Sequence, residues 1–570
     1  MKHEYCHLLT PEGENLPTVP WADDYPRPLL KRDSFFCLNG EWEFSADGTN
    51  EPTEKITVPF PPESRLSGIC RFMGKVPRLY YRKKFSLPDG FVRARVILHF
   101  GAVDQYARVI FNGHEFEEHM GGYEAFSFDV TDFLAPENTV EVYARDEYRN
   151  CRLPYGKQRA KRGGMWYTPV SGIWQTIWLE SVPENYVEGL RIASDMRGAT
   201  VHADGVSEGE ITVSTPTGEM TVRLENGTAR IEPPDVRLWS PEDPYLYRFV
   251  LRTEEDEVSS YFACREVTCG NVNGCARLLL NGKPYFFHAL LDQGYYSDGI
   301  FTPAAPVCFE NDILAAKSLG FNTLRKHIKL EPERFYYDCD RLGMLVFQDI
   351  INNGKYSFLR DTVLPTLGFL EKNDRRLHKN RASRAAHLLG MQFTVWRLAS
   401  HPSVVYWTIF NEGWGQFDGA AAYERLRNFE GSRVIDTASG WFTGVPSDVV
   451  SPHIYFKPVT FTPAEKPTVL SEFGGYSYPV EGHRFNTEKE YGYRKYSDPD
   501  AFAEAVEKLY REEILPAARA GLSGAVLTQL SDVEDETNGL LTYDRRVLKL
   551  TPERMLPIAQ ELQDAVKETN

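Results

Sequence analysis

Long apolar runs are missing from this chain of 570 residues, and no stretch approaches the length of a membrane-spanning helix. The segment Met1–Trp21 also lacks the positive stretch and apolar run of a secretory leader. We therefore expect a cytoplasmic protein without a membrane partner. Basic residues are outnumbered, because 64 lysines and arginines face 80 acidic residues and give a net charge of −16. This balance disfavours nucleic acid as a partner, since phosphate binding needs a basic face.

Closely paired cysteines and histidines are absent as well. The nine cysteines are scattered and form no Cys-x-x-Cys motif, so we expect reduced, mostly buried thiols. Four histidines lie in or near predicted strands, without His-x-His or His-Glu-x-x-His spacing: His288, His327, His401 and His453. The sequence therefore predicts no metal centre and no required cofactor, while an accessory divalent cation stays open.

The chain contains three successive patterns. Residues 1–182 alternate short strands with turns such as Asn39-Gly40 and Asn112-Gly113, which predicts a jelly-roll β-sandwich. Residues 183–275 form a second β segment of about ninety residues, the size of a small immunoglobulin-like sandwich. In residues 276–570, strands alternate with helical runs at 309–319, 375–399, 420–430 and 500–520, which favours a (β/α)8 barrel. The eight predicted strands are 285–291, 322–328, 345–349, 404–410, 433–437, 448–455, 468–473 and 524–530.

Two glutamates stand at the ends of apolar strands in the barrel. Glu412 follows the fourth predicted strand, within Asn411-Glu412-Gly413-Trp414, and Glu472 ends the seventh, before Phe473-Gly474-Gly475. A buried carboxylate is costly unless it has a function, and barrel enzymes carry their chemistry at the C-terminal ends of the strands. Two such carboxylates are what glycoside hydrolysis requires. The alternative is a pair of structural carboxylates that cap the following helices.

These motifs resemble glycoside hydrolase family 2, which contains β-galactosidases, β-glucuronidases and β-mannosidases. Asn411-Glu412 matches the family's acid/base motif, Glu472 matches its nucleophile, and His401-Pro402-Ser403-Val404-Val405 matches the approach to the fourth strand. Leu38-Asn39-Gly40-Glu41-Trp42 and Val170-Ser171-Gly172-Ile173-Trp174-Gln175 resemble the family's sugar-binding sandwich. The resemblance covers nearly the whole chain and implies hydrolysis with retained configuration. It also implies that Asn411 binds the sugar 2-hydroxyl and that Tyr455 bonds to the nucleophile.

Further residues near the predicted strand ends are candidates for substrate binding. Arg325 could keep Glu472 ionised, or it could form an ion pair that stabilises the barrel. Contact with the sugar and a structural role are both open for the remaining candidates, which are His327, Asp292, Trp414, Trp441, Asp532 and Glu534.

The identity of the sugar depends on the loops after the first and eighth strands. The family's glucuronidases carry an Asn-x-Lys motif after the eighth strand, and Leu541–Lys549 lacks it, although Arg545 or Arg546 could supply a cation. We therefore expect an exo-acting hydrolase of neutral β-hexosides, galactosides first and mannosides next, with β-glucuronides as the alternative. A non-catalytic carbohydrate-binding protein and a metal-dependent barrel hydrolase are the rival classes. Members of the family are often oligomeric, so a homo-oligomer is expected as an option.

Overall fold

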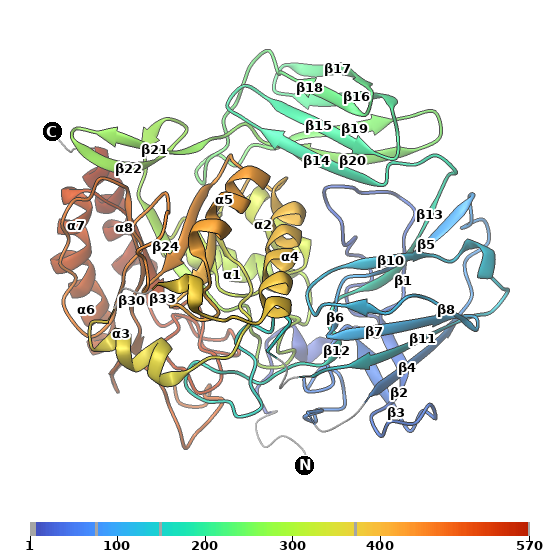
Figure 1. The fold of residues 1–570 in the computed structure, drawn as a ribbon, viewed down its shortest axis with the longest axis horizontal. Helices are drawn as coiled ribbons and strands as arrows, with labels where there is room; N and C mark the ends of the chain where they lie inside the picture. The colour runs from blue at the N-terminus through green and yellow to red at the C-terminus, as the bar shows by residue number, and fades with distance from the viewer. Residues whose placement is uncertain (1–6, 75–77, 148–150, 370–372, 568–570) are drawn as a thin grey trace.

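The computed structural model describes residues 7–74, 78–147, 151–369 and 373–567. Figure 1 shows two β bodies and a C-terminal barrel in chain order. The fold class predicted from the sequence is confirmed, with a jelly-roll sandwich, an immunoglobulin-like sandwich and a (β/α)8 barrel. The positions of the boundaries between them stay predictions.

The first sandwich packs two antiparallel sheets around an apolar core. One sheet has the strand order β1-β13-β5-β10, and the other has β3-β2-β4-β11-β7-β8 with β9 paired to β7. In β7 every second residue is buried, because successive side chains of a strand point to opposite faces. The bounds are β1 (Phe36–Cys37), β2 (Gly40–Ser45), β3 (Glu54–Val58), β4 (Leu79–Phe85), β5 (Arg95–Phe100), β6 (Val103–Asp104), β7 (Tyr106–Phe111), β8 (His114–Glu115), β9 (His119–Met120), β10 (Phe126–Asp129), β11 (Asn138–Arg145), β12 (Gly172–Ile173) and β13 (Ile177–Val182).

The second sandwich consists of seven antiparallel strands in the order β14-β15-β18-β17-β16-β19-β20. Its strands enclose a separate apolar cluster that includes Ile211, Val213 and Phe249. The bounds are β14 (Gly189–Ser194), β15 (Ala199–Asp204), β16 (Glu208–Thr215), β17 (Gly218–Glu225), β18 (Thr228–Ile231), β19 (Tyr247–Arg252) and β20 (Glu257–Phe262). A small sheet of β21 (Val267–Val272), β22 (Cys275–Leu280) and β23 (Lys283–Pro284) follows, and it leads into the barrel.

All eight predicted barrel strands are present as one parallel sheet of order β28-β27-β26-β25-β24-β33-β30-β29. A parallel bridge between Gly440 and Pro452 joins the two ends of this order, so the barrel is nearly closed. The sixth strand is much shorter than predicted. The bounds are β24 (Phe287–Asp292), β25 (Thr323–Lys326), β26 (Leu345–Asp349), β27 (Val404–Asn411), β28 (Val434–Ser439), β29 (His453–Ile454), β30 (Thr468–Gly474) and β33 (Leu522–Thr528).

Helices follow six of the eight barrel strands, and none of the described helices lies between β28 and β29 or between β29 and β30. Their bounds are α1 (Val307–Ser318), α2 (Glu333–Leu342), α3 (Leu364–Thr366), α4 (Arg381–Leu398), α5 (Gly419–Phe429), α6 (Pro499–Leu509), α7 (Leu515–Ala520) and α8 (Pro552–Lys567). The start of α6 is specified locally, because Asp498 accepts a hydrogen bond from Ala501 N and Pro499 occupies the first turn. A π-helical turn over Tyr510–Ile514 joins α6 to α7, so the predicted run 500–520 is interrupted once.

The thiols differ from their expected state. Cys70 is disulfide-bonded, which corrects the expectation of fully reduced cysteines. Among the described free cysteines, Cys264, Cys308 and Cys339 are buried, whereas Cys269 is exposed and three others are half-buried. The sequence therefore also overestimated how many of the thiols are buried. None of the described helices combines the length and the apolar character needed to cross a bilayer.

Candidate active site

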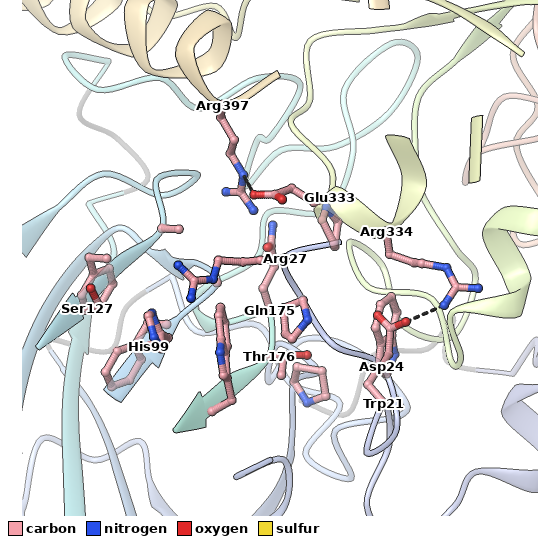
Figure 2. Close-up of a pocket in the computed structure, with 18 of the residues that line it drawn as sticks. Trp21, Asp24, Arg27, His99, Ser127, Gln175, Thr176, Glu333, Arg334 and Arg397 are labelled. Atoms are coloured by element: carbon pink, nitrogen blue, oxygen red, sulfur yellow. Dashed lines mark hydrogen bonds and ion pairs between the residues drawn. The ribbon is translucent and has the colours of Figure 1, made fainter. Parts of the chain in front are cut away.

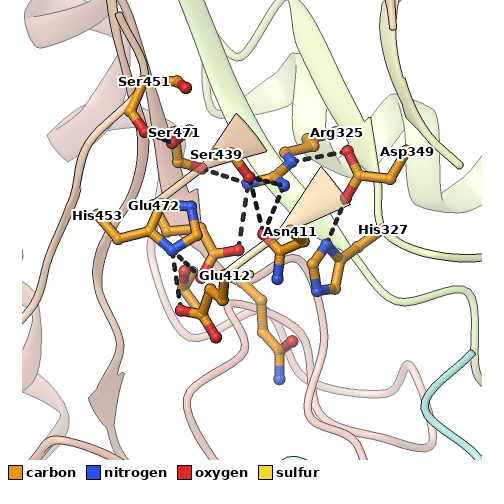
Figure 3. Close-up of polar contacts among 12 residues, drawn as sticks. Arg325, His327, Asp349, Asn411, Glu412, Ser439, Ser451, His453, Ser471 and Glu472 are labelled. Carbon is orange, nitrogen blue, oxygen red and sulfur yellow. Dashed lines mark hydrogen bonds and ion pairs between the residues drawn. The ribbon is translucent and has the colours of Figure 1, made fainter. Parts of the chain in front are cut away.

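The two glutamates meet at the C-terminal mouth of the barrel (Figure 3). Glu472 lies in β30 and is 5% exposed, whereas Glu412 directly follows β27 and is half-buried. A carboxylate oxygen of each lies within 4.8 Å of the other. Glu412 adopts a left-handed backbone conformation, with φ of 53°, and its N–H donates to Ser439 O at 2.8 Å. Strained backbone of this kind clusters at functional sites.

His453 links the two carboxylates, a role that the sequence did not indicate. Its Nδ1 lies 2.9 Å from Glu412 Oε1 and 3.5 Å from Glu472 Oε2, and its side chain is fully buried. β29 places it directly beside Glu472 in the parallel register. The position of His453 at the end of the sixth strand was the available signal, although the sequence pattern pointed there only to a possible metal ligand.

Arg325 connects Glu472 to the floor of the site. From β25, its guanidinium donates to Glu472 Oε1 at 3.1 Å, to Asn411 Oδ1 at 2.9 Å and to Asp349 Oδ1 at 3.0 Å. Burial acts to raise the pKa of Glu472, but the positive charges of His453 and Arg325 outweigh it and hold that pKa well below its usual range. Arg325 pairs with both Asp349 and Glu472, so both roles that the sequence left open for it stay open.

Asn411 is held by its carbonyl oxygen. Its Oδ1 accepts from Arg325 and from Ser439 Oγ, at 2.9 Å in each case. Because both bonds use the oxygen, the amide NH2 group has no acceptor among the described residues and is available to a ligand. This orientation agrees with a bond to a sugar hydroxyl, which stays a prediction.

Tyr455 and His327 flank the pair of carboxylates. The Tyr455 hydroxyl donates to Glu472 Oε2 at 2.5 Å, and its ring stacks on Tyr493 with 4.1 Å between centroids. His327 Nδ1 lies 2.6 Å from Asp349 Oδ2, and burial lowers the pKa of His327 to about 4. A neutral imidazole that donates to Asp349 leaves Nε2 as an acceptor.

The three other acidic candidates are already bonded within the protein. Asp292 accepts from Lys326 Nζ at 2.5 Å, and Asp532 accepts from Lys549 Nζ at 2.6 Å. Glu534 accepts from the backbone N–H of Thr168 at 2.7 Å, which joins the loop after the eighth strand to the first sandwich. Their roles in sugar binding stay predictions, and their bonds show what each does in the fold.

The two candidate tryptophans have different surroundings. Trp414 is 3% exposed and packs edge-on against Tyr155 and Trp166, at centroid distances of 5.5 and 4.9 Å. Trp441 is half-buried, and its ring lies edge-on to His453 at 5.6 Å. Trp441 therefore contacts the histidine that links the two carboxylates, whereas Trp414 is buried in an aromatic cluster, and sugar binding by either stays a prediction.

A segment of the first sandwich, residues 151–168, crosses the mouth of the barrel, and we call it the strap. It contacts the loops after five barrel strands. These contacts are Tyr167 with Tyr295, Gly156 with Ile328, Tyr155 with Asn352, Trp166 with Trp414, and Thr168 with Glu534. The strap therefore forms part of the wall of the site, although it belongs to a different domain.

The loop after the eighth strand contributes Glu536, which the sequence reasoning overlooked in favour of its neighbours. Glu536 is 4% exposed and accepts from Gln529 Nε2 at 2.9 Å. Burial raises the pKa of Glu536 to about 7, Lys157 of the strap opposes this, and the nearby Glu472 adds to it. Glu536 is therefore another buried acid of this loop, beside Asp532 and Glu534.

A divalent ion could bind at one place among the described residues. The ligand atoms of Glu412, His453 and Glu472 all lie within 4.8 Å of one another. This donor set would suit a transition metal, but it consists of the two glutamates and the histidine that already contacts them. An ion there would compete with a sugar for the same oxygens.

A cavity of about 250 Å³ lies between the first sandwich and the barrel and is separate from this site (Figure 2). Arg334 of α2 donates to Asp24 at 2.5 Å, and Arg397 of α4 donates to Glu333 at 3.2 Å along its wall. None of the residues predicted for the active site lines it.

Two carboxylates at the C-terminal mouth of a barrel, behind two β-sandwiches, define a class of multidomain barrel glycoside hydrolases. Comparison with known proteins identifies the family. Residues 70–168 match the glycosyl hydrolase 2 galactose-binding domain-like model, residues 194–265 match the glycosyl hydrolases family 2 model, and residues 275–474 match its TIM barrel domain. The chain belongs to glycoside hydrolase family 2, as its motifs suggested, and it is a glycosidase.

Relatives with named activities include two different sugar specificities. The chain is 23% identical over 449 residues to a β-glucuronidase of Paenibacillus borealis, covering 70% of this chain and 71% of that protein. It is 24% identical over 346 residues to a β-galactosidase of Thermoanaerobacter pseudethanolicus, covering 55% of this chain and 44% of that protein. The solved β-D-glucuronidase of Dictyoglomus thermophilum has a TM-score of 0.72 at 18% identity, covering 95% of this chain and 98% of that one. At this identity the structural likeness shows the fold alone.

Proposed function

We propose that this glycosidase cleaves terminal β-glycosides with retention of configuration, by double displacement. The observation that carries this proposal is the proximity of the two carboxylates, which have oxygens within 4.8 Å of each other. Retaining enzymes place their carboxyl groups about 5–5.5 Å apart, whereas inverting enzymes need roughly 6.5–9.5 Å to admit a water molecule. The separation therefore favours direct attack by a carboxylate.

Glu472 is the nucleophile in this mechanism. Arg325 and Tyr455 each donate to one of its oxygens, so the carboxylate is ionised and oriented before a substrate binds. Its attack on the anomeric carbon forms a glycosyl ester, while Glu412 protonates the departing oxygen. Glu412 then takes a proton from water, which attacks the same carbon and releases the sugar. No step requires a cofactor.

For the substrate we propose a neutral β-hexoside at the end of a chain, with β-galactosides first and β-mannosides next. The loop after the eighth strand offers little to a uronate, because Arg545 donates to Asp312 at 3.0 Å and Arg546 to Glu14 at 2.6 Å. The strap narrows the mouth of the barrel, which supports cleavage at a chain end.

A β-glucuronide is the second candidate substrate. It is favoured by the β-glucuronidases among the relatives, such as that of Paenibacillus borealis. A panel of p-nitrophenyl β-galactoside, β-mannoside and β-glucuronide separates the candidates. Preference for the glucuronide would overturn the neutral-sugar proposal without affecting the mechanism.

The stereochemical proposal is tested by proton NMR of the first sugar released from the preferred substrate. We expect the β-anomer to appear first and the α-anomer to follow by mutarotation. First release of the α-anomer would show inversion and would overturn the double displacement. A chelator should leave the rate of hydrolysis unchanged. If the chelator abolished hydrolysis and an added divalent ion restored it, the reaction would depend on a metal.

A further inference from the structure

The cavity between the first sandwich and the barrel (Figure 2) has the outer face of a sheet as one wall. Strands β10, β5 and β13 place Ser127, His99 and Trp178 side by side in the antiparallel register. The neighbouring Leu98 and Leu179 point to the opposite face and belong to the sandwich core. Helices α2 and α4 of the barrel supply the facing wall. The cavity therefore lies where two domains meet, and both contribute side chains to it.

Three buried donors on these walls have no hydrogen-bond partner among the described residues. They are Gln175 Nε2, Trp178 Nε1 and Arg397 Nη1. Gln175 and Trp178 are 4% and 3% exposed, and the side chain of Arg397 is 7% exposed. A buried N–H without an acceptor is costly, and each of these atoms can only donate. The cavity therefore suits a ligand that brings hydrogen-bond acceptors.

The charges on the walls disfavour an anion as that ligand. Each of the three arginines that line the cavity already donates to a carboxylate. The pairs are Arg27 with Glu180, Arg334 with Asp24, and Arg397 with Glu333. Glu188 adds a further carboxylate to the lining. An anion would bring a charge that no free cation balances, whereas uncharged hydroxyl oxygens accept hydrogen bonds without this cost.

Aromatic rings give the cavity an apolar side as well. Trp178 stacks on His99 with 4.8 Å between centroids, and Trp396 of α4 lines the cavity while 52% exposed. Ser127 is exposed too, so the cavity is open to solvent on the side of β10 and α4. Its volume of about 250 Å³ lies below the range of about 300–1,000 Å³ that is usual for drug-sized ligands. A single ring with one apolar face therefore fits better than a longer ligand.

We propose that this cavity is a second carbohydrate site, which binds one uncharged pyranose ring away from the catalytic carboxylates. Gln175, Trp178 and Arg397 donate to its hydroxyl oxygens, and Trp396 covers its apolar face at the opening. Because the walls come from two domains, a bound sugar also stabilises the contact between the sandwich and the barrel. The inference goes beyond the proposed function and does not depend on it, since the site needs no turnover.

The test measures binding in a Glu472→Gln background, which prevents turnover by the proposed mechanism. Methyl β-galactoside, methyl β-mannoside and methyl β-glucuronide are titrated calorimetrically, and crystals soaked in each sugar locate it. We expect the two neutral sugars in the cavity and the glucuronide at least about tenfold weaker there, because its charge is uncompensated. The neutral sugars should also raise the midpoint of thermal unfolding in proportion to their occupancy.

Matched variants assign the binding to the cavity. Trp396→Ala should weaken binding of the neutral sugars there at least about tenfold. Leu389→Ala changes another exposed apolar residue of α4, one that does not line the cavity, and should stay within about twofold. Trp178→Phe retains a ring and removes the N–H, so binding should weaken roughly 3- to 10-fold, the size of one neutral hydrogen bond.

Three results would overturn the inference. Soaked crystals could hold only water in the cavity, Trp396→Ala could bind as tightly as Leu389→Ala, or the glucuronide could occupy the cavity as tightly as the neutral sugars. Trp396 and Leu389 are both exposed, so this comparison stands even if Trp178→Phe fails to fold. With Glu472 intact, Trp396→Ala should hydrolyse p-nitrophenyl glycosides within about threefold of the wild-type rate. Absence of any hydrolysis by wild type would overturn the proposed function and leave the second site to be decided by the binding data.

Discussion

Two buried carboxyl groups, Glu472 at the barrel mouth and Glu63 inside the first sandwich, are almost fully shielded from solvent but have different partners. Glu472 has Arg325 and His453 beside it, and its pKa is held well below the usual range in spite of burial. Glu63 accepts from Ser171 N at 3.0 Å and Ser171 Oγ at 2.8 Å, and burial raises its pKa to about 8. Nearby cations, and not burial, therefore decide which carboxyl group is ionised.

The difference in ionisation between Glu472 and Glu63 matches the different tasks of the two sites. A nucleophile must be ionised, so the barrel surrounds Glu472 with cations and donors. Burial also raises the pKa of Asp104 and Asp146 near Glu63, so this sandwich group is most stable when protonated.

Replacement of the nucleophile should give the largest effect. Glu472→Gln should lower kcat at least about 10⁴-fold, because the attacking group is removed. Glu63→Gln makes the same chemical change at an equally buried position and should leave kcat within about threefold. Steady-state rates on the preferred p-nitrophenyl glycoside measure both, and equal losses in the two variants would contradict the assignment.

Loss of the cation beside the nucleophile should have the next largest effect. Arg325→Met should lower kcat about 10²- to 10³-fold, because Glu472 loses a charge-assisted donor. Since Arg325 lowers the pKa of Glu472, its removal should also move the acid limb of the pH–rate profile to higher pH. Arg325→Lys retains the charge and should shift the limb less. An unchanged limb in Arg325→Met would argue against control by this charge.

Loss of the uncharged hydroxyl donor of Tyr455 should lower kcat less than loss of Arg325. Tyr455→Phe removes the hydroxyl that donates to Glu472 Oε2 at 2.5 Å. We expect kcat to fall roughly 10- to 100-fold, with little change in thermal stability. A rate equal to wild type would assign Tyr455 to packing against Tyr493 alone.

The sandwich carboxylates should affect stability and not rate. The pKa of Glu63 is raised from 4.5 in the unfolded chain to about 8 in the folded protein. Its contribution to the free energy of unfolding is therefore fully present below pH 4.5 and is lost as the pH rises through 8. Glu63→Gln should remove this loss. The free energy of unfolding of the variant, relative to wild type, should be about 1–3 kcal/mol larger at pH 8 than at pH 5. Denaturant unfolding of wild type and variant at the two pH values measures this difference. The same pH dependence in both proteins would refute the prediction.

The sequence predicted the parts of the site that depend on local pattern. Apolar strands that end in polar residues located Glu412, Glu472 and Arg325, and the alternation of strands with helices predicted the barrel. The strap was beyond this reasoning, because it meets the barrel loops only through tertiary packing. Glu536 could not be told from Asp532 and Glu534, because all three acids lie in one short loop and their different partners, Gln529, Lys549 and Thr168, meet them only once the chain has folded.

The most direct test of the central claim is to trap the glycosyl ester. A 2-deoxy-2-fluoro β-glycoside of the preferred sugar, with a good leaving group, slows both steps and lets the covalent intermediate accumulate. Peptide mass spectrometry should then find one fluoro-sugar attached to Glu472. Attachment at Glu412, or turnover without any covalent adduct, would contradict the assignment of Glu472 as the nucleophile.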